Sequence, residues 1–259
     1  MDRRLTSRDA LEAAARDAAA EGDELDALVA PLTAEGWATS TPADGWSVRT
    51  TIAHLFVSDE AGLASTRGED LTAYIPPILE PVFDGTDAEL LAAWRASRGA
   101  LHAAVLAVPD GQKLPWFGPP MSPIAFFTAR LMETWAHGQD VADALGVRRA
   151  PTGRLRHVCE IGFRTRTWSY VVAECEAPTT PVRLALGAPD GSTWTWGPAD
   201  APESITGSAH DFALLVTQRR HRDDLGLVAR GSAADEWLAI AQAYAGFPGT
   251  GRPRGLPPA

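Results

Sequence analysis

The chain contains little cysteine and no long apolar run. Its two cysteines, Cys159 and Cys175, are too few and too far apart for a CxxC redox or zinc motif, so we expect two buried free thiols. No apolar run approaches the roughly 18 to 20 residues that span a bilayer, which argues against a membrane protein. The segment from Met1 to Glu21 lacks the basic start, apolar centre and cleavage site of an export signal. We therefore expect a cytoplasmic protein.

Positive charge is also scarce. The net charge is −10, the sequence pI is about 5.0, and Lys113 is the only lysine. Binding to a phosphate backbone depends on clustered positive charge, so nucleic acid is not an expected partner. What the chain does have is core material, because 45% of its 259 residues are hydrophobic. That is enough for one large or two ordinary domains.

Apolar residues in the first half recur at helical intervals in four segments. The predicted helices cover Ser7–Leu32, Val48–Ser65, Asp87–Val108 and Ser122–Leu145. Between the second and third helices, the proline-rich stretch from Arg67 to Asp84 is expected to be an irregular crossover that covers a site. The sequence therefore predicts a four-helix bundle.

The pattern changes between Arg148 and Gly153, which is where we expect a domain junction. Strand and helix patterns alternate beyond it. The predicted strands are Pro181–Leu186, Ser192–Trp196 and Ser204–Gly207, and the predicted helices are Leu155–Ala173, Ala209–Gln218 and Ser232–Tyr244, before a Gly/Pro-rich tail at Gly246–Ala259. The expected fold is mainly α with a smaller α+β part, divided into domains at residues 1–147 and 152–259.

Glu133 and His137 lie four residues apart in an apolar stretch, so both point from one face of the same helix. Polar groups in an apolar environment cost roughly several kcal/mol unless something binds them, and a divalent metal can bind both. His54 is the best third ligand, because it follows an N-cap serine, Ser47, on another apolar helix. The E-x-x-x-H spacing alone is a weak signal, and an ordinary hydrogen-bonded pair is the alternative.

Two blocks resemble a known family. They are G-W-S-V-R-x-x-x-A-H-L at Gly45 to Leu55 and E-x-x-x-H-x-x-D at Glu133 to Asp140. With these blocks the chain resembles the mycothiol-dependent maleylpyruvate isomerases, in the wider DinB-like superfamily of metal-binding bundles. The resemblance implies a DinB-like four-helix bundle followed by a sterol-carrier-like α+β domain. It also implies a zinc ion held by His54, Glu133 and His137, and mycothiol as a thiol cosubstrate.

Two imidazoles and one carboxylate leave open positions on a metal, as catalytic zinc sites do. Zinc lowers the pKa of a bound thiol or polarises a carbonyl. In the isomerases that this chain resembles, the thiol adds reversibly to a conjugated double bond, which allows rotation before elimination. The same thiolate can displace a leaving group, so S-transferase chemistry is a natural variant. The ligand set also permits iron or another divalent metal, but two ligands on one helix favour the bundle family over iron oxygenases.

Further residues are assigned around this site. Asp140 is expected to orient a histidine ligand without binding the metal itself, and a fourth ligand or a cap near Gly146 are the alternatives. Arginines bind carboxylates and polar groups through paired donors, and an aromatic loop can line a substrate entrance. The candidates for binding substrate or thiol are Arg130, one turn before Glu133, together with Trp116, Arg49, Arg164 and Arg220.

The function predicted from these residues is that of a zinc-dependent isomerase or thiol S-transferase acting on a small electrophilic molecule, as a monomer or homodimer. Two other classes remain open. One is a thiol-independent, metal-dependent lyase, hydrolase or cyclase in a biosynthetic pathway. The other is non-catalytic, either a metal-sensing module or a carrier of an apolar ligand. A deep cavity that opens onto the metal would favour an enzyme, and a closed four-ligand site would favour sensing.

Overall fold

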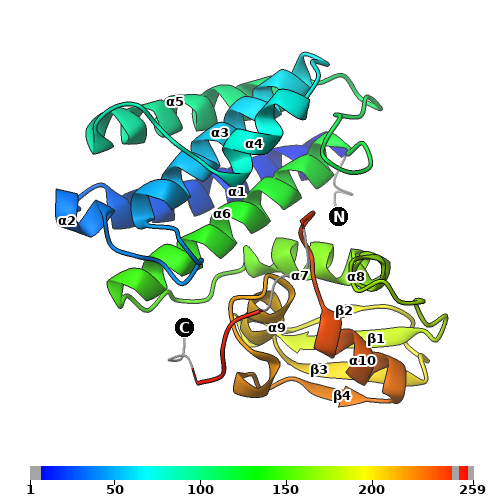
Figure 1. The fold of residues 1–259 in the computed structure, drawn as a ribbon. Coiled ribbons are helices and arrows are strands. Elements are labelled where there is room, and N and C mark those ends of the chain that lie inside the picture. Colours follow the sequence, from blue (N-terminus) through cyan, green and yellow to red (C-terminus); the bar gives the residue numbers. More distant parts are fainter. Residues whose placement is uncertain (1–6, 247–250, 256–259) are drawn as a thin grey trace. The chain divides into compact units, whose positions relative to one another are not determined.

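The chain folds into two units, shown in Figure 1. The computed structural model describes residues 7–246 and 251–255. The first unit is Met1–Arg148 and the second is Arg149–Ala259. The candidate metal ligands all belong to the first unit, whereas Arg164 and Arg220 belong to the second.

The first unit is a bundle of four long helices with short helical connections (Figure 1). Its elements are α1 (Ser7–Val29), α2 (Ala34–Trp37), α3 (Val48–Thr66), the 3-10 helix η1 (Thr72–Tyr74), α4 (Ile75–Leu79), α5 (Asp87–Leu106) and α6 (Pro123–Leu145). Helix α3 packs mainly on α5, and α1 packs mainly on α6. The predicted four-helix bundle is confirmed.

Local chemistry sets the ends of the two helices that carry the candidate ligands. The side chain of Ser47 accepts a hydrogen bond from the backbone N–H of Thr50 and caps the start of α3. Ser122 caps α6 in the same way, and Pro123 occupies its first turn. Gly146 ends α6 in the left-handed conformation, at φ 65°. Serine, proline and glycine at these positions are residue types that indicate helix ends in a sequence.

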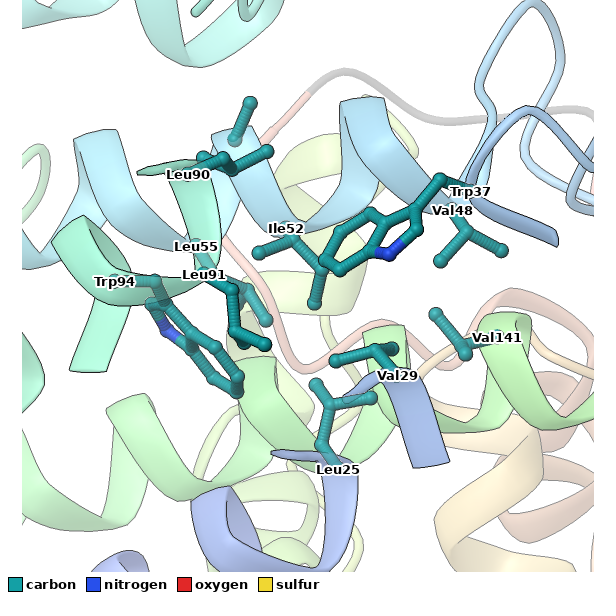
Figure 2. Packing of buried hydrophobic residues seen from close by; sticks show 11 residues of the cluster. Leu25, Val29, Trp37, Val48, Ile52, Leu55, Leu90, Leu91, Trp94 and Val141 are labelled. Carbon is teal, nitrogen blue, oxygen red and sulfur yellow. The ribbon is translucent and has the colours of Figure 1, made fainter. Parts of the chain in front are cut away.

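One apolar cluster holds α1, α2, α3, α5 and α6 together (Figure 2). Its large members include Trp37 from α2, Ile52 from α3, Trp94 from α5 and Val141 from α6. Full burial of one such side chain is worth about 1.5 to 3 kcal/mol, so the cluster is a major source of the bundle's stability. It fixes α3 against α6, which are the two helices that must converge to form the site.

The crossover after α3 is more regular than predicted, because it contains η1 and α4. Pro76 and Pro77 sit in the first turn of α4, where the backbone N–H that proline lacks has no partner within the helix. The prediction of an irregular crossover was therefore wrong over Thr72 to Leu79. Helix α4 packs on α3, which places a backbone carbonyl of α4 beside His54.

The second unit is an α+β domain with one four-stranded sheet (Figure 1). Its elements are α7 (Leu155–Arg164), α8 (Arg166–Val172), β1 (Val182–Gly187), β2 (Thr193–Trp196), β3 (Glu203–Ser208), α9 (Ala209–Val216), the 3-10 helix η2 (Arg222–Asp224), β4 (Val228–Arg230) and α10 (Ser232–Ile240). The strand order is β2-β1-β3-β4, with β1 and β3 parallel and the two outer pairs antiparallel. The predicted α+β class is confirmed.

Several details of the second unit differ from the sequence predictions. The helix expected over Leu155–Ala173 breaks at Thr165 into α7 and α8, and the three-residue strand β4 was not predicted because it is too short to show alternation. Cys159 is buried, and burial raises the pKa of its thiol, but Cys175 is exposed, which corrects the expectation of two buried thiols. Of the predicted tail, residues 247–250 and 256–259 lie outside the described residues.

Among the described residues, every helix is too short or too polar to cross a bilayer.

A half-buried histidine makes the stability of the bundle sensitive to acid. His102 on α5 packs edge-on against Phe127 at a ring distance of 5.1 Å. Burial, together with the positive charges of Arg98 and Arg130, lowers the pKa of His102 to about 4. The unfolded chain takes up this proton near pH 6.5 and the folded chain only near pH 4, so stability falls as the pH drops through that window.

Between pH 7 and pH 4, the unfolding free energy of the wild type falls. We expect it to fall by about 2 to 3 kcal/mol less in His102→Gln, because the variant has no imidazole to protonate. Urea unfolding at a series of pH values measures this. Above pH 8 the imidazole is neutral in both states, so the variant should show no change in slope there. An unchanged acid slope between pH 7 and pH 4 would contradict the assignment.

Candidate metal centre

Three side chains from two helices converge in the first unit. His54 comes from α3, and Glu133 and His137 come from α6. One ligand atom from each lies within 4.8 Å of the other two. Oε2 of Glu133 is 3.9 Å from Nε2 of His54 and 3.5 Å from Nε2 of His137. The Nε2 atoms of the two imidazoles therefore lie close to the same carboxylate oxygen.

The opposite edge of each imidazole faces a hydrogen-bond acceptor. Nδ1 of His54 is 2.9 Å from the backbone oxygen of Ile78 on α4. Because a carbonyl oxygen only accepts, this nitrogen carries the proton, and Nε2 of the neutral ring keeps its lone pair. Nδ1 of His137 lies 3.4 Å from Oδ2 of Asp140, whose side chain is fully buried. Histidine ligands of metals are oriented by partners of this kind.

The protonation states of His54 and Glu133 are those that bind a cation, a neutral imidazole and an ionised carboxylate. Burial lowers the pKa of His54, and the neighbouring His137 lowers it further, so the imidazole of His54 is neutral at pH 7. Burial by itself would raise the pKa of Glu133. The close approach of the His137 and His54 imidazoles outweighs that effect and holds the pKa of Glu133 well below the ordinary value. The cluster thus offers a carboxylate beside a neutral imidazole.

The donor set fits a divalent metal of the zinc type, for which two imidazole nitrogens and one carboxylate oxygen are suitable ligands. The side chain of Glu133 remains 29% exposed, whereas those of His54 and His137 are 11% and 10% exposed. The cluster is therefore reachable from the side of the carboxylate. Such access suits a site that also admits a small molecule.

An aromatic neighbour of the cluster was not predicted from the sequence. The indole of Trp46 lies 5.6 Å from the ring of His137 and nearly parallel to it, with an interplanar angle of 18°. It lies 5.0 Å from the ring of His54, at 48°. Trp46 precedes α3 in a turn, and no local pattern in the sequence indicates which way its indole points. In the sequence it appeared only as the tryptophan of the G-W-S-V-R block.

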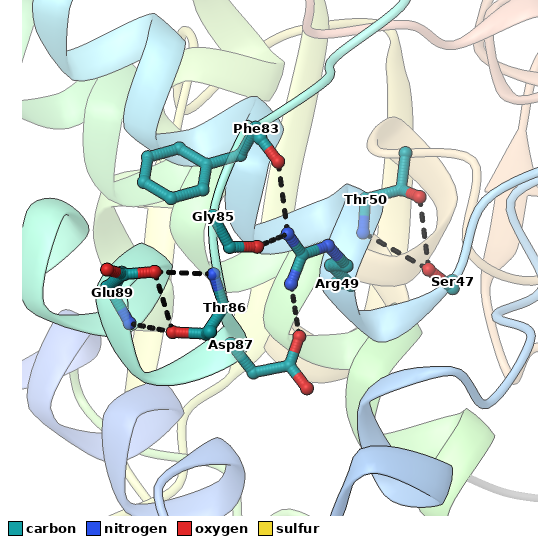
Figure 3. A network of polar contacts seen from close by, with 8 residues as sticks. All are labelled: Ser47, Arg49, Thr50, Phe83, Gly85, Thr86, Asp87 and Glu89. Atoms are coloured by element: carbon teal, nitrogen blue, oxygen red, sulfur yellow. Dashed lines mark hydrogen bonds and ion pairs between the residues drawn. The ribbon is translucent and has the colours of Figure 1, made fainter.

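Arg130 and Arg49 are both bonded within the protein. Nη2 of Arg130 donates to Oδ1 of Asp59 at 2.9 Å, and both side chains are buried. Arg49 pairs with Asp87 and donates to the backbone oxygens of Phe83 and Gly85 (Figure 3). It thereby ties the first turn of α3 to the start of α5. Both arginines are thus held by internal contacts, and the role predicted for them in binding substrate stays a prediction.

The other three residues predicted to bind substrate or thiol, Arg164, Arg220 and Trp116, have contacts with residues outside the His54, Glu133 and His137 cluster. Arg164 pairs with Glu160 on an exposed side of α7, and Nη1 of the buried Arg220 donates to the backbone oxygen of Arg219 at 2.7 Å. Trp116 packs against Phe117 and Phe126 and lines a pocket of about 430 Å³. None of His54, Glu133 and His137 is among the residues that line this pocket. The role predicted for Trp116 at a substrate entrance stays a prediction.

The chain is similar to two protein families and to two mycobacterial proteins. Residues 18–142 match the family described as mycothiol maleylpyruvate isomerase N-terminal domain, and residues 178–230 match the one described as wyosine base formation. Two uncharacterized proteins, from two strains of Mycobacterium tuberculosis, are each 49% identical over 248 residues, which cover 91% of this chain and 96% of theirs.

Two crystal structures of mycothiol-dependent maleylpyruvate isomerase, one of them a histidine-to-alanine mutant, share the fold. Their TM-scores are 0.57 and 0.59, at 16% and 17% identity, and each match covers 85% of this chain and 92% of the other. Fold and side-chain cluster together define a DinB-like helical bundle with a candidate metal site, followed by an α+β domain. Residues 18–142 belong to the family of the mycothiol maleylpyruvate isomerase N-terminal domain, and the chain belongs with the two mycobacterial proteins, to which it is related over nearly its whole length.

Proposed function

We propose that this protein is a zinc-dependent enzyme of the isomerase or S-transferase type, which uses mycothiol to act on a small electrophilic molecule. The observation that carries the proposal is the convergence of His54, Glu133 and His137. The match of residues 18–142 to the mycothiol maleylpyruvate isomerase N-terminal domain supports it. The exposed edge of Glu133 supports an open, catalytic site over a closed, structural one.

The proposed chemistry divides between the metal and the protein. Zinc, when bound, would lower the pKa of a thiol so that the thiolate is present at neutral pH, or would polarise a carbonyl. The protein supplies the ligands in the right protonation states. Ile78 and Asp140 face the Nδ1 atoms and leave the Nε2 atoms of His54 and His137 for the ion. Burial of both histidines limits the access of water from their side.

Isomerisation and transfer differ in the fate of the thiol. In an isomerase the thiolate adds to a conjugated double bond, the resulting single bond rotates, and elimination regenerates the thiol. In an S-transferase the thiolate displaces a leaving group, a new carbon–sulfur bond forms, and the thiol is consumed. The expected product of the second reaction is a stable conjugate, whereas the first leaves the amount of thiol unchanged.

The test is a rate comparison on the full-length protein loaded with zinc. We expect it to consume a model electrophile, such as a cis-configured unsaturated diacid or a haloarene, faster with mycothiol than without it. Thiol content and product mass after the reaction separate isomerisation from transfer.

Two controls sharpen the test. Protein stripped of metal by a chelator should lose the thiol-dependent rate and regain it when zinc is restored. Equal rates with and without mycothiol, in protein that holds zinc, would reject the thiol mechanism and leave a thiol-independent lyase, hydrolase or cyclase.

The proposal keeps the cytoplasmic location and the monomer or homodimer expected from the sequence. Light scattering of the purified protein measures the second of these.

A further inference from the structure

The indole of Trp46 contacts both candidate histidine ligands at once. Its ring centroid lies 5.0 Å from that of His54 and 5.6 Å from that of His137, and the two imidazoles are 4.6 Å apart. We propose that Trp46 is a positioning residue, which fixes the planes of both imidazoles and so sets the affinity of the site for its metal. This inference rests on the proposed function, because it requires a metal at these histidines.

The contacts at Nδ1 leave one rotation of each imidazole unrestrained. The contacts of Nδ1 with Ile78 and Asp140 hold one edge of each imidazole. Rotation of a ring about the axis through that edge would still swing its plane, and with it the lone pair of Nε2. A flat surface packed against the ring face restrains this rotation. Stacking at 18° on His137 provides such a surface, and the tilted contact restrains His54.

Trp46 is itself held in place by its turn. Its backbone oxygen accepts from the backbone N–H of Thr41 at 2.8 Å and from the Thr41 hydroxyl at 3.1 Å, and its N–H donates to the oxygen of Ala43. Ser40 and Ser47 pair as a bridge across the turn. Gly45, directly before Trp46, has φ +72°, a conformation that other residues rarely adopt. The backbone position from which the indole extends is therefore fixed, and an indole on a fixed backbone can restrain its neighbours.

Trp46 also lines a polar pocket of about 430 Å³, together with hydroxyl-bearing residues of the turn and of the start of α3. Of the three candidate ligands, Glu133 has the most exposed side chain, at 29%.

The test measures Co²⁺ binding to the metal-free, full-length protein by visible absorption. Trp46→Leu keeps an apolar side chain but removes the flat surface, and we expect it to weaken Co²⁺ binding about tenfold or more. Trp46→Phe keeps an aromatic face and should remain within about threefold of the wild type. Trp168→Phe, at an exposed tryptophan of the second unit, is the matched control and should bind like the wild type.

Fluorescence gives an independent readout, because Co²⁺ quenches a nearby indole. We expect Trp46→Phe to lose the largest part of the Co²⁺-dependent quenching and Trp168→Phe to retain it. Wild-type affinity in a folded Trp46→Leu variant would overturn the inference while leaving the metal site intact. Absence of Co²⁺ binding by the wild type would overturn the metal site and this inference with it.

Discussion

His137→Ala is expected to lower the bound metal from about one ion per chain to well below one, because catalytic zinc sites typically rely on three protein ligands. Nε2 of His137 lies 3.5 Å from the carboxylate of Glu133, and no other described histidine or cysteine joins this cluster to replace it. His54→Ala should have the same effect, since it removes the ligand supplied by α3. Metal analysis after dialysis against a weak chelator and reloading with zinc measures the stoichiometry.

A matched control for this experiment is His221→Ala. The side chain of His221 is 39% exposed and belongs to the second unit, so the variant should hold as much metal as the wild type. Circular dichroism of each variant verifies that the bundle is still folded. Full metal content in folded His54→Ala and His137→Ala would remove the proposed site and the zinc-dependent function with it.

The second large effect concerns the buried ion pair of Asp59 and Arg130, which joins α3 to α6. Burial raises the pKa of Asp59 even though the neighbouring Arg130 lowers it, so desolvation outweighs the attraction between the two charges. The pair is therefore not expected to be a net source of stability. Removal of one member alone is expected to destabilise the protein, because it leaves a buried charge without a partner.

Asp59→Leu and Arg130→Met are each expected to lower the unfolding free energy by about 3 to 5 kcal/mol. The double variant, which replaces both charges by apolar groups, should lose far less than the sum of the two. Nε of Arg130 has no hydrogen-bond partner among the described residues, which adds to the cost of keeping this side chain buried. Urea unfolding of the four proteins forms a double-mutant cycle that measures the coupling.

The exposed pair of Asp26 and Arg95 supplies the control cycle. It also joins two helices, α1 and α5, with two hydrogen bonds of 2.6 Å, but the side chain of Arg95 is 49% exposed. Its coupling should be about 1 kcal/mol or less, because water screens the charges. Equal coupling in the two cycles would show that burial does not control the effect of these ion pairs.

Much of the fold could be predicted because its signals are local. The four long helices follow from apolar periodicity, and the caps at Ser47, Ser122 and Gly146 follow from backbone chemistry that each residue brings with it. The short elements were less predictable. The two prolines in α4 indicated an irregular stretch, and β4 is stabilised by pairing with β3 rather than by a pattern of its own.

The candidate site divides in the same way. The spacing of Glu133 and His137 already places them on one face of one helix, whatever else the chain does. His54 was chosen because it lies on another apolar helix, and the resemblance to a family implied the same ligand, but the pairing of that helix with α6 depends on residues far apart in the chain. The internal partners of Arg130 and Arg49 could not be predicted, because arginine in a helix gives no sign of its partner. Asp59 and Asp87 became visible as those partners only after α3 was packed against α5 and α6.

By itself, then, the sequence determined the helices, the acidic charge and the i, i+4 pair of carboxylate and imidazole, all of which depend on residues close together in the chain. Tertiary structure alone decided that the carbonyl of Ile78 meets His54, that Trp46 stacks on His137, and that both Nε2 atoms approach one carboxylate oxygen. The physical reason is that backbone carbonyls and buried indoles are common, so the sequence does not show which of them will lie beside the site. Only the packing of distant segments selects which one contacts the site.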